Sequence, residues 1–217
     1  MGQLNVVASN YTDVERMVAG RSLPIAWFVS TWCGTAPSQR FAYVRELQRY
    51  IQIDIYGKCG PLECLGRKKC DQMLSKQYYF YLAFENSVCK DYITEKFFRA
   101  LENGVVPIVL HGDTYKRAGV PDHIYIAADS FPSPRALADY LNGLISNRTA
   151  YMAYFDWLHT HKTASSKLLQ SYSLQAQACI LCAKLHDHAM PSKHYKSLRD
   201  WWVTDSACLA DYGRTIL

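Results

Sequence analysis

One stretch of the sequence, residues 80–98 (FYLAFENSVCKDYITEKFF), gathers polar side chains where an apolar run ends. Glu85 and Asn86 close that run, and Glu95 and Lys96 follow in a segment with helical spacing. A carboxylate can accept hydrogen bonds from two ribose hydroxyls, and a lysine can neutralise a pyrophosphate. The free amides at a helix N-terminus also favour an anion. These residues therefore predict a site for a nucleotide diphosphate.

A helix that begins at Asp91 would place Tyr92, Glu95, Lys96 and Arg99 on one face, because their spacing is i, i+3, i+4 and i+7. An aromatic ring on that face can stack on a base or cap a sugar. The plainer interpretation is that the charged pair forms a solvated helix face and that Asn86 is a turn residue. Spacing alone does not decide between the two interpretations.

The elements that would position these residues alternate along the chain. Short apolar runs predict strands at residues 25–30, 53–57, 78–86, 105–112 and 123–131, and amphipathic spacing predicts helices at 38–51, 91–104 and 133–146. Strands that are apolar throughout are buried on both faces, which is typical of a parallel sheet with helices on each side. The sequence thus predicts an α/β, Rossmann-like fold. Ligands bind beyond the carboxyl ends of such strands, where Glu85 and Asn86 are expected.

We divide the chain into three parts. Residues 1–22 are expected to be irregular, residues 23–160 form the nucleotide-binding domain, and residues 161–217 form a helical extension with a Cys-X-X-Cys motif.

The composition of the 217 residues is globular, with 49% hydrophobic and 20% charged residues. The formal net charge of +5 suits an anionic ligand, but the basic residues form no run of the kind that binds nucleic acid. No apolar run is long enough to span a bilayer.

Eight cysteines are present, four of them between residues 59 and 89, and this number favours an oxidising compartment. The disulfide candidates are Cys59, Cys64, Cys70, Cys89, Cys179 and Cys182. The last two could instead bind zinc, but a zinc site needs ligands at a second spacing, so we favour disulfide use. Asn10 and Asn147 begin Asn-X-Thr sequons and are candidate glycosylation sites. Asp54 could be catalytic, although a lone aspartate near a strand end is more often structural.

The stretch FYLAFENSVCKDYITEKFFRAL, followed by GVVPIVL, closely resembles the signature of the α1,3-fucosyltransferases, glycosyltransferase family 10. IAWFVSTWCG, RELQRYIQIDIYGKCG, SFPSPRALADYL and YMAYFDW resemble the same family in the same order, so the resemblance covers roughly residues 22 to 210. The cysteine pattern after IYG looks most like the branch that acts on the core of N-glycans.

The resemblance implies roles for five residues. Asn86, Tyr92, Glu95 and Lys96 would bind the ribose and pyrophosphate of GDP-fucose, and Arg40 would neutralise the phosphates. Lys96 and Arg40 would be the catalytic cations, because positive charge stabilises the departing GDP. The chain has no Asp-X-Asp pair, so neither a metal nor another cofactor is expected.

The resemblance also implies an architecture and a location. The family fold is a two-domain GT-B arrangement, of which this chain matches the C-terminal, donor-binding half. The implied activity is inverting α1,3 transfer of fucose from GDP-fucose to N-acetylglucosamine of a glycoprotein N-glycan, at the lumenal side of the Golgi membrane. The alternative is a truncated, non-catalytic donor-binding fragment or pseudoenzyme that lacks the acceptor domain and the general base.

Overall fold

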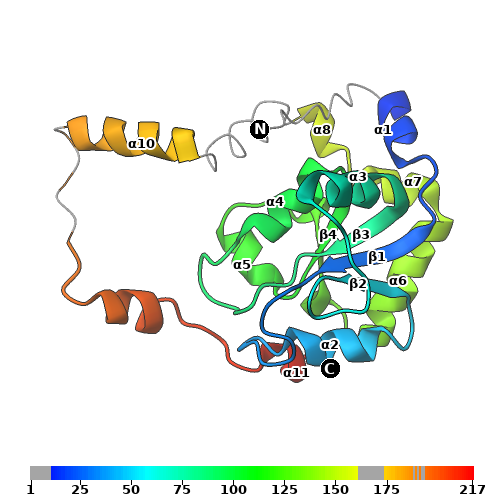
Figure 1. Ribbon diagram of the computed structural model, residues 1–217, viewed down its shortest axis with the longest axis horizontal. Coiled ribbons are helices and arrows are strands. Elements are labelled where there is room, and N and C mark those ends of the chain that lie inside the picture. Colours follow the sequence, from blue (N-terminus) through cyan, green and yellow to red (C-terminus); the bar gives the residue numbers. More distant parts are fainter. Residues whose placement is uncertain (1–10, 161–173, 188, 190, 192–193) are drawn as a thin grey trace.

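The computed structural model describes residues 11–160, 174–187, 189, 191 and 194–217. Its centre is a sheet in which each paired strand runs parallel to its neighbour. The strands are β1 (Leu23–Phe28), β2 (Ile53–Tyr56), β3 (Tyr78–Leu82), β4 (Val106–Val109) and β5 (Ile126–Ala127). Their order is β2-β1-β3-β4-β5 (Figure 1), so the direction of winding reverses between β1 and β3.

Helices cover both faces of this sheet, which confirms the predicted α/β, Rossmann-like class. The helices of the main body are α1 (Tyr11–Val18), α2 (Arg40–Leu47), α3 (Arg67–Gln77), α4 (Glu95–Glu102), α5 (Gly112–Arg117), α6 (Pro134–Ser146), α7 (Arg148–Ala153) and α8 (Trp157–Thr160). Helices α3 and α4 pack on one face, whereas α6 contacts both β1 and α2 on the other (Figure 1). This division follows from the right-handed crossovers of parallel strands on either side of the reversal.

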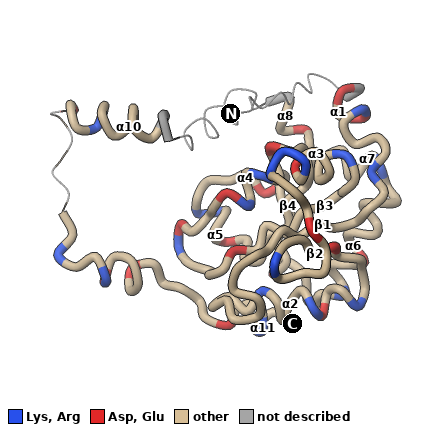
Figure 2. Tube along the Cα trace, viewed as in Figure 1, with Lys and Arg blue, Asp and Glu red and all other residues tan. Residues whose placement is uncertain are grey.

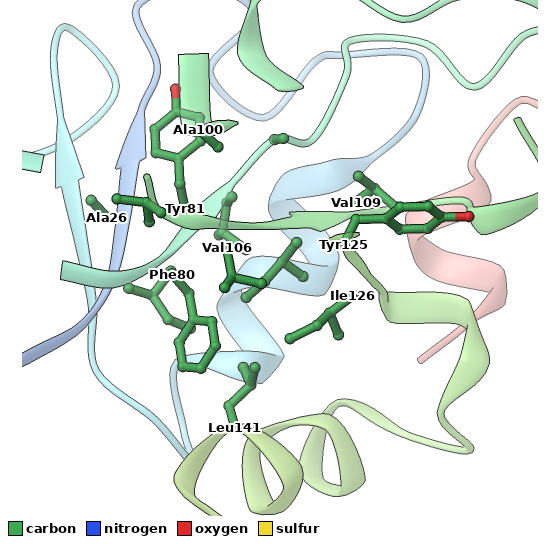
Figure 3. Packing of buried hydrophobic residues seen from close by; sticks show 14 of the residues in the cluster. Ala26, Phe80, Tyr81, Ala100, Val106, Val109, Tyr125, Ile126 and Leu141 are labelled. Atoms are coloured by element: carbon green, nitrogen blue, oxygen red, sulfur yellow. The ribbon is translucent and has the colours of Figure 1, made fainter. Parts of the chain in front are cut away.

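The core consists of strand side chains that alternate between the two helical layers. Phe80 points toward Leu141 of α6, whereas the next residue, Tyr81, points toward Ala100 of α4 (Figure 3). All four side chains are buried. Because successive strand residues face opposite sides, a run that is apolar at every position can fill both layers.

The two outer strands of the sheet end in different ways. Strand β5 has two residues, because 3₁₀ turns at Asp122–Ile124 and Ala128–Ser130 interrupt the predicted strand 123–131 on both sides. At the other edge, the cysteine-rich loop pairs with β2 through a parallel bridge between Tyr56 and Leu62. The loop comes so close that a Cβ on Gly60 would overlap the carbonyl oxygen of Ile55.

The C-terminal region contains α10 (Leu174–His186), a π-helical turn at Asp200–Thr204 and α11 (Tyr212–Thr215). In Figure 1, α10 and the π-helical turn extend away from the sheet, and the chain then returns to α11 beside α2. Among the described residues, none of the helices has the length and apolar character required to cross a membrane. Lysines and arginines are spread over many elements and mixed with acidic residues (Figure 2).

Two predicted boundaries were wrong. Helix α1 occupies residues 11–18, within the segment expected to be irregular, and it buries Val14 and Val18 against the core. Helix α4 begins at Glu95 rather than near Asp91, which has a left-handed backbone with φ of 59°. The predicted C-terminal glycine of this helix, Gly104, does adopt a positive φ of 60°.

Candidate functional site

The winding reverses between β1 and β3, and the side chain of Arg40 bridges the carboxyl ends of these two strands. Its guanidinium donates one hydrogen bond to the carbonyl oxygen of Phe84, just after β3, at 2.7 Å. It donates a second to the carbonyl oxygen of Thr31, beyond β1, at 3.3 Å. The side chain also lies over the ring of Trp27, with 5.5 Å between the guanidinium carbon and the ring centroid. Arg40 therefore ties together the ends of β1 and β3.

Arg40 is 2% exposed, so it is more deeply buried than the pocket edge predicted from the sequence. Burial lowers its pKa, and the nearby negative charge of Glu85 acts in the opposite direction. Its Nε atom has no hydrogen-bond partner among the described residues. The guanidinium thus places a buried positive charge at the ends of β1 and β3, and one of its donors has no partner among the described residues.

Glu85, which the sequence placed at the site without a role in binding the donor, is the centre of a polar cluster. One carboxylate oxygen accepts hydrogen bonds from the backbone amide and the hydroxyl of Thr94, both at 2.8 Å. The other oxygen accepts from the Lys96 ammonium at 2.9 Å. Glu85 is buried, and it satisfies the amide of the N-cap residue of α4. This contact fixes the start of the helix four residues later than the sequence predicted.

The same contact changes the expected role of the helix N-terminus. The sequence predicted that its free amides would face an anionic ligand, but the Thr94 amide already binds the Glu85 carboxylate. A carboxylate of the protein therefore occupies part of the position that a phosphate was expected to take.

Lys96 has three acceptors within reach of its ammonium group. Besides Glu85, these are the Thr94 hydroxyl at 2.7 Å and a carboxylate oxygen of Glu95 at 3.2 Å. The Glu95 side chain is 71% exposed, so it is the partner nearest to solvent. Burial raises the pKa of Glu95, but the Lys96 charge and the hydrogen bonds from Thr94 and Lys96 outweigh this and lower it. The predicted pair Glu95 and Lys96 thus lies together and is joined to the buried Glu85.

The remaining predicted residues lie in the loop between β3 and α4. Asn86 is half-buried, and its side-chain oxygen has no hydrogen-bond partner among the described residues. Tyr92 is half-buried in the loop and not on the helix face. Arg99, expected on that face, donates instead to Asp71 at 2.7 Å and lies over the ring of Phe28. Arg99 is therefore held away from the cluster.

A small cavity lies next to Glu85, between the segments that follow β3 and β4. It is bordered by Glu85, Tyr92, His111 and Tyr115 and has a volume of about 10 Å³, roughly the space for one water molecule. A nucleotide is far too large for this cavity.

Three disulfides are present: Cys33–Cys59, Cys64–Cys70 and Cys89–Cys208. Cys64–Cys70 lies within the cysteine-rich region where a disulfide was predicted. The candidates Cys179 and Cys182 were wrong, because both are exposed free thiols on α10. Among the described residues, no three His, Cys, Asp or Glu side chains are arranged to hold a metal. Cys33 and Cys208 were missed, because their partners are distant in sequence.

The side chains of two other candidates, Asp54 and Asn147, make hydrogen bonds within the fold. Asp54 accepts hydrogen bonds from the Tyr78 hydroxyl at 2.6 Å and the Gln52 amide at 2.9 Å, which supports the structural interpretation. Asn147 is exposed, and its side-chain oxygen accepts from the Ala150 amide at the start of α7. Asn10 lies outside the described residues.

The C-terminal segment crosses the carboxyl end of the sheet beside the Glu85 loop. Leu209 donates its amide to the carbonyl oxygen of Val88 at 2.7 Å, next to the Cys89–Cys208 disulfide. Further along, Gly213 donates to the carbonyl oxygen of Ser38, immediately before α2. The segment therefore links the loop after β3 to the start of α2.

Comparison with known proteins gives a consistent result. Residues 18–201 match the model of the C-terminal region of glycosyltransferase family 10 (fucosyltransferase). The chain is 40% identical over 200 residues to α-(1,3)-fucosyltransferase C of Drosophila melanogaster, which covers 90% of this chain and 44% of the relative. It is 47% identical over 148 residues to α-(1,3)-fucosyltransferase fut-1 of Caenorhabditis elegans, and this match covers 67% of this chain and 34% of the relative. It is 42% identical over 191 residues to glycoprotein 3-α-L-fucosyltransferase A of Drosophila melanogaster, and this match covers 85% of this chain and 36% of the relative.

The chain therefore spans less than half the length of these three relatives. Among solved structures, it resembles that of an α1,3-fucosyltransferase with GDP, with a TM-score of 0.51 and 22% identity over 62% of this chain and 38% of that one. This likeness shows a shared fold.

Proposed function

The chain belongs to glycosyltransferase family 10, the fucosyltransferases, and on this premise we propose that it is the GDP-fucose-binding part of an α1,3-fucosyltransferase. The observation that carries the proposal is a continuous series of contacts that starts at the carboxyl ends of β1 and β3. Arg40 binds the carbonyl of Phe84, the next residue Glu85 binds Lys96, and Lys96 binds Glu95. Two cations and one exposed carboxylate thus meet where a nucleotide is expected.

The donor binds by replacing a partner of Lys96. All three N–H groups of the ammonium have acceptors before the ligand arrives. Glu95 is the most exposed of these acceptors, so the pyrophosphate displaces it at the lowest cost of desolvation. The released carboxylate then accepts hydrogen bonds from the ribose hydroxyls. Asn86, with its unused side-chain oxygen, and Tyr92 complete the donor site.

Transfer requires stabilisation of the GDP leaving group. Negative charge grows on the β-phosphate as its bond to the fucose anomeric carbon breaks, and the acceptor hydroxyl attacks from the opposite side, with inversion. Lys96 contacts this charge directly, and the buried Arg40 adds to the positive potential. No metal or other cofactor is required in this scheme.

The acceptor is an N-acetylglucosamine residue of a glycoprotein N-glycan, as in the core α1,3 branch. The name of one Drosophila relative, glycoprotein 3-α-L-fucosyltransferase A, supports a glycoprotein acceptor. Three disulfides support an oxidising compartment, and we place the protein at the lumenal side of the Golgi membrane.

Calorimetry with GDP tests the donor site. Lys96→Ala should weaken GDP binding by about 30-fold or more, because it removes a charge-assisted hydrogen bond worth about 2 kcal/mol. Lys116→Ala is the matched control, because Lys116 is an exposed lysine of helix α5. This variant should bind GDP as tightly as the unmodified chain. No GDP binding by the unmodified chain, or equal affinities for the two variants, would overturn the assignment. Transfer from labelled GDP-fucose to an N-glycopeptide tests the activity separately.

A further inference from the structure

A second and larger cavity lies on the other side of Tyr92. It has a volume of about 720 Å³ and lies between the loop after β3 and the C-terminal segment. Tyr92 borders both this cavity and the small cavity beside Glu85. Its size is within the range of about 300–1,000 Å³ that is typical of small-ligand sites.

A disulfide and backbone hydrogen bonds join the two walls of this cavity. Cys89 on one wall is joined to Cys208 on the other by a disulfide that spans 119 residues of sequence. The Lys90 amide donates to the carbonyl oxygen of Ser206 at 2.8 Å, and Val88 and Leu209 form an antiparallel bridge. The cavity is therefore a built feature of the fold and not a chance gap between two loops.

One wall presents a cluster of aromatic side chains. Trp201 is 41% exposed and Trp202 is 65% exposed, with their ring centroids 5.7 Å apart and their planes at 61° in an edge-to-face arrangement. The centroid of the Tyr195 ring lies 4.6 Å from that of Trp201. Exposed neighbouring tryptophans are uncommon and mark binding surfaces. The electron-rich face of an indole suits the weakly positive C–H face of a pyranose ring.

The rim of the cavity identifies the charge of its occupant. The side-chain carboxylates of Asp91 and Asp205 make no hydrogen bond or ion pair within the described part of the chain, and Lys90 is the cation beside them. Two carboxylates and one ammonium give a net negative rim, which repels a diphosphate. Free carboxylates are strong acceptors for hydroxyl groups. An aromatic cluster with such a rim fits a neutral, hydroxyl-rich ligand and does not fit the nucleotide.

We infer that this cavity binds a pyranose ring of the acceptor glycan, next to the donor and distinct from the nucleotide position. The choice of a glycan as the source of the sugar rests on the proposed function. The more exposed indole, Trp202, stacks against the sugar ring and Trp201 borders it. Asp91 and Asp205 accept hydrogen bonds from the sugar hydroxyls, and Tyr92 separates the sugar from the donor site.

The test uses the full 217-residue chain and the indole N–H signals of its tryptophans in NMR spectra. The probe is chitobiose, the β1,4-linked dimer of N-acetylglucosamine. It should shift the signals of Trp201 and Trp202 and leave the signal of Trp32 unchanged, with a dissociation constant on the order of 1 mM. Trp32, which is 53% exposed in the loop after β1, is the matched control.

Trp202→Ala should weaken chitobiose binding by about ten-fold, whereas Trp32→Ala should have no effect. Asp205→Asn, which keeps the shape of the rim, should weaken it by about three-fold. Both pocket variants should bind GDP normally. If chitobiose leaves the Trp201 and Trp202 signals in place, or if Trp202→Ala binds it normally, the inference is wrong. Competition between GDP and chitobiose for the cavity would equally overturn a distinct sugar site.

The two proposals can fail separately. Loss of GDP binding with chitobiose binding retained would reject the donor assignment and keep the sugar site. The reverse result would reject the sugar site and keep the donor assignment.

Discussion

Each end of the sheet buries one arginine, and the two arginines differ in how completely their donors are hydrogen-bonded. At the amino end, Arg21 uses each part of its guanidinium. It donates to the Tyr151 hydroxyl and the Gly104 carbonyl, both at 2.7 Å, and to the Ser75 carbonyl at 3.2 Å. These partners come from α7, the turn before β4 and α3, so Arg21 joins three elements in one fully bonded contact.

At the carboxyl end, Arg40 binds two carbonyls, and neither its Nε nor the Asn86 side-chain oxygen has a hydrogen-bond partner among the described residues. Buried polar groups are normally satisfied, so an exception calls for an explanation. We propose that the arginine at the amino end serves stability, whereas the groups at the carboxyl end keep hydrogen-bonding capacity for a ligand.

The largest effect is expected from the covalent link at the carboxyl end. Replacing Cys89 and Cys208 with serine removes a constraint over 119 residues. In the chain-entropy model this lowers the free energy of unfolding by about 5 kcal/mol. The same replacement of Cys64 and Cys70, which are 6 residues apart, should cost about 2 kcal/mol. Urea denaturation measures both. Equal losses would mean that the C-terminal segment stays docked without its disulfide.

The next largest effect is expected from replacing Arg21, whose guanidinium makes three hydrogen bonds. Arg21→Leu leaves three acceptors, two of them buried, without a donor and should lower the free energy of unfolding by about 4 kcal/mol. GDP affinity, measured at a temperature where the variant remains folded, should not change. Arg40→Leu should lower stability by about 2 kcal/mol and also weaken GDP binding. The exposed Arg49→Leu is the control. A loss of GDP affinity in Arg21→Leu would contradict the division between the two ends.

Replacing Asn86 should have a smaller effect, and it should change stability and GDP affinity in opposite directions. Asn86→Ala removes a half-buried side chain whose oxygen has no partner among the described residues. Stability should stay the same or rise by about 1 kcal/mol, because an unsatisfied group is lost. GDP binding should weaken by about ten-fold, because the ligand loses a hydrogen bond. A variant that is less stable but binds GDP normally would show that Asn86 is a structural turn residue.

The smallest effect concerns acid stability. The pKa of Glu95 is lowered in the folded protein, so the unfolded chain binds more protons and the stability that Glu95 contributes is present above its unfolded pKa. That contribution is lost as the pH falls through the folded pKa. Glu95→Gln should therefore show a slightly shallower loss of stability between about pH 5 and pH 3. Urea unfolding at several pH values measures the slope, and an unchanged slope would exclude a role for the Lys96–Glu95 contact.

Local patterns predicted much of the fold. The apolar runs located β2, β3 and β4, and Ser133 caps α6 as expected, accepting the Ala136 amide at 3.2 Å. The start of α4 could not be predicted, because the group that fixes it is a side chain beyond β3. The length of β5 was also missed, since its flanking apolar residues form turns that leave them buried.

The residues of the candidate site could be predicted from the sequence, but the hydrogen bonds between them could not. Motif resemblance located Asn86, Tyr92, Glu95 and Lys96, yet it gave no sign that Glu85 would bind both Thr94 and Lys96. The depth of Arg40 depends on carbonyl oxygens of two separate strand ends, which no sequence window contains together. The large cavity was missed for the same reason, because its two walls are brought together by Cys208.

The outer strands of the sheet have a further consequence. Unpaired strand edges are templates on which other chains can add, and this leads to aggregation. Here β5 offers two residues, and the pairing of Tyr56 with Leu62 covers the free side of β2. The folded sheet therefore offers little open backbone at either edge with which the strand of another chain could pair.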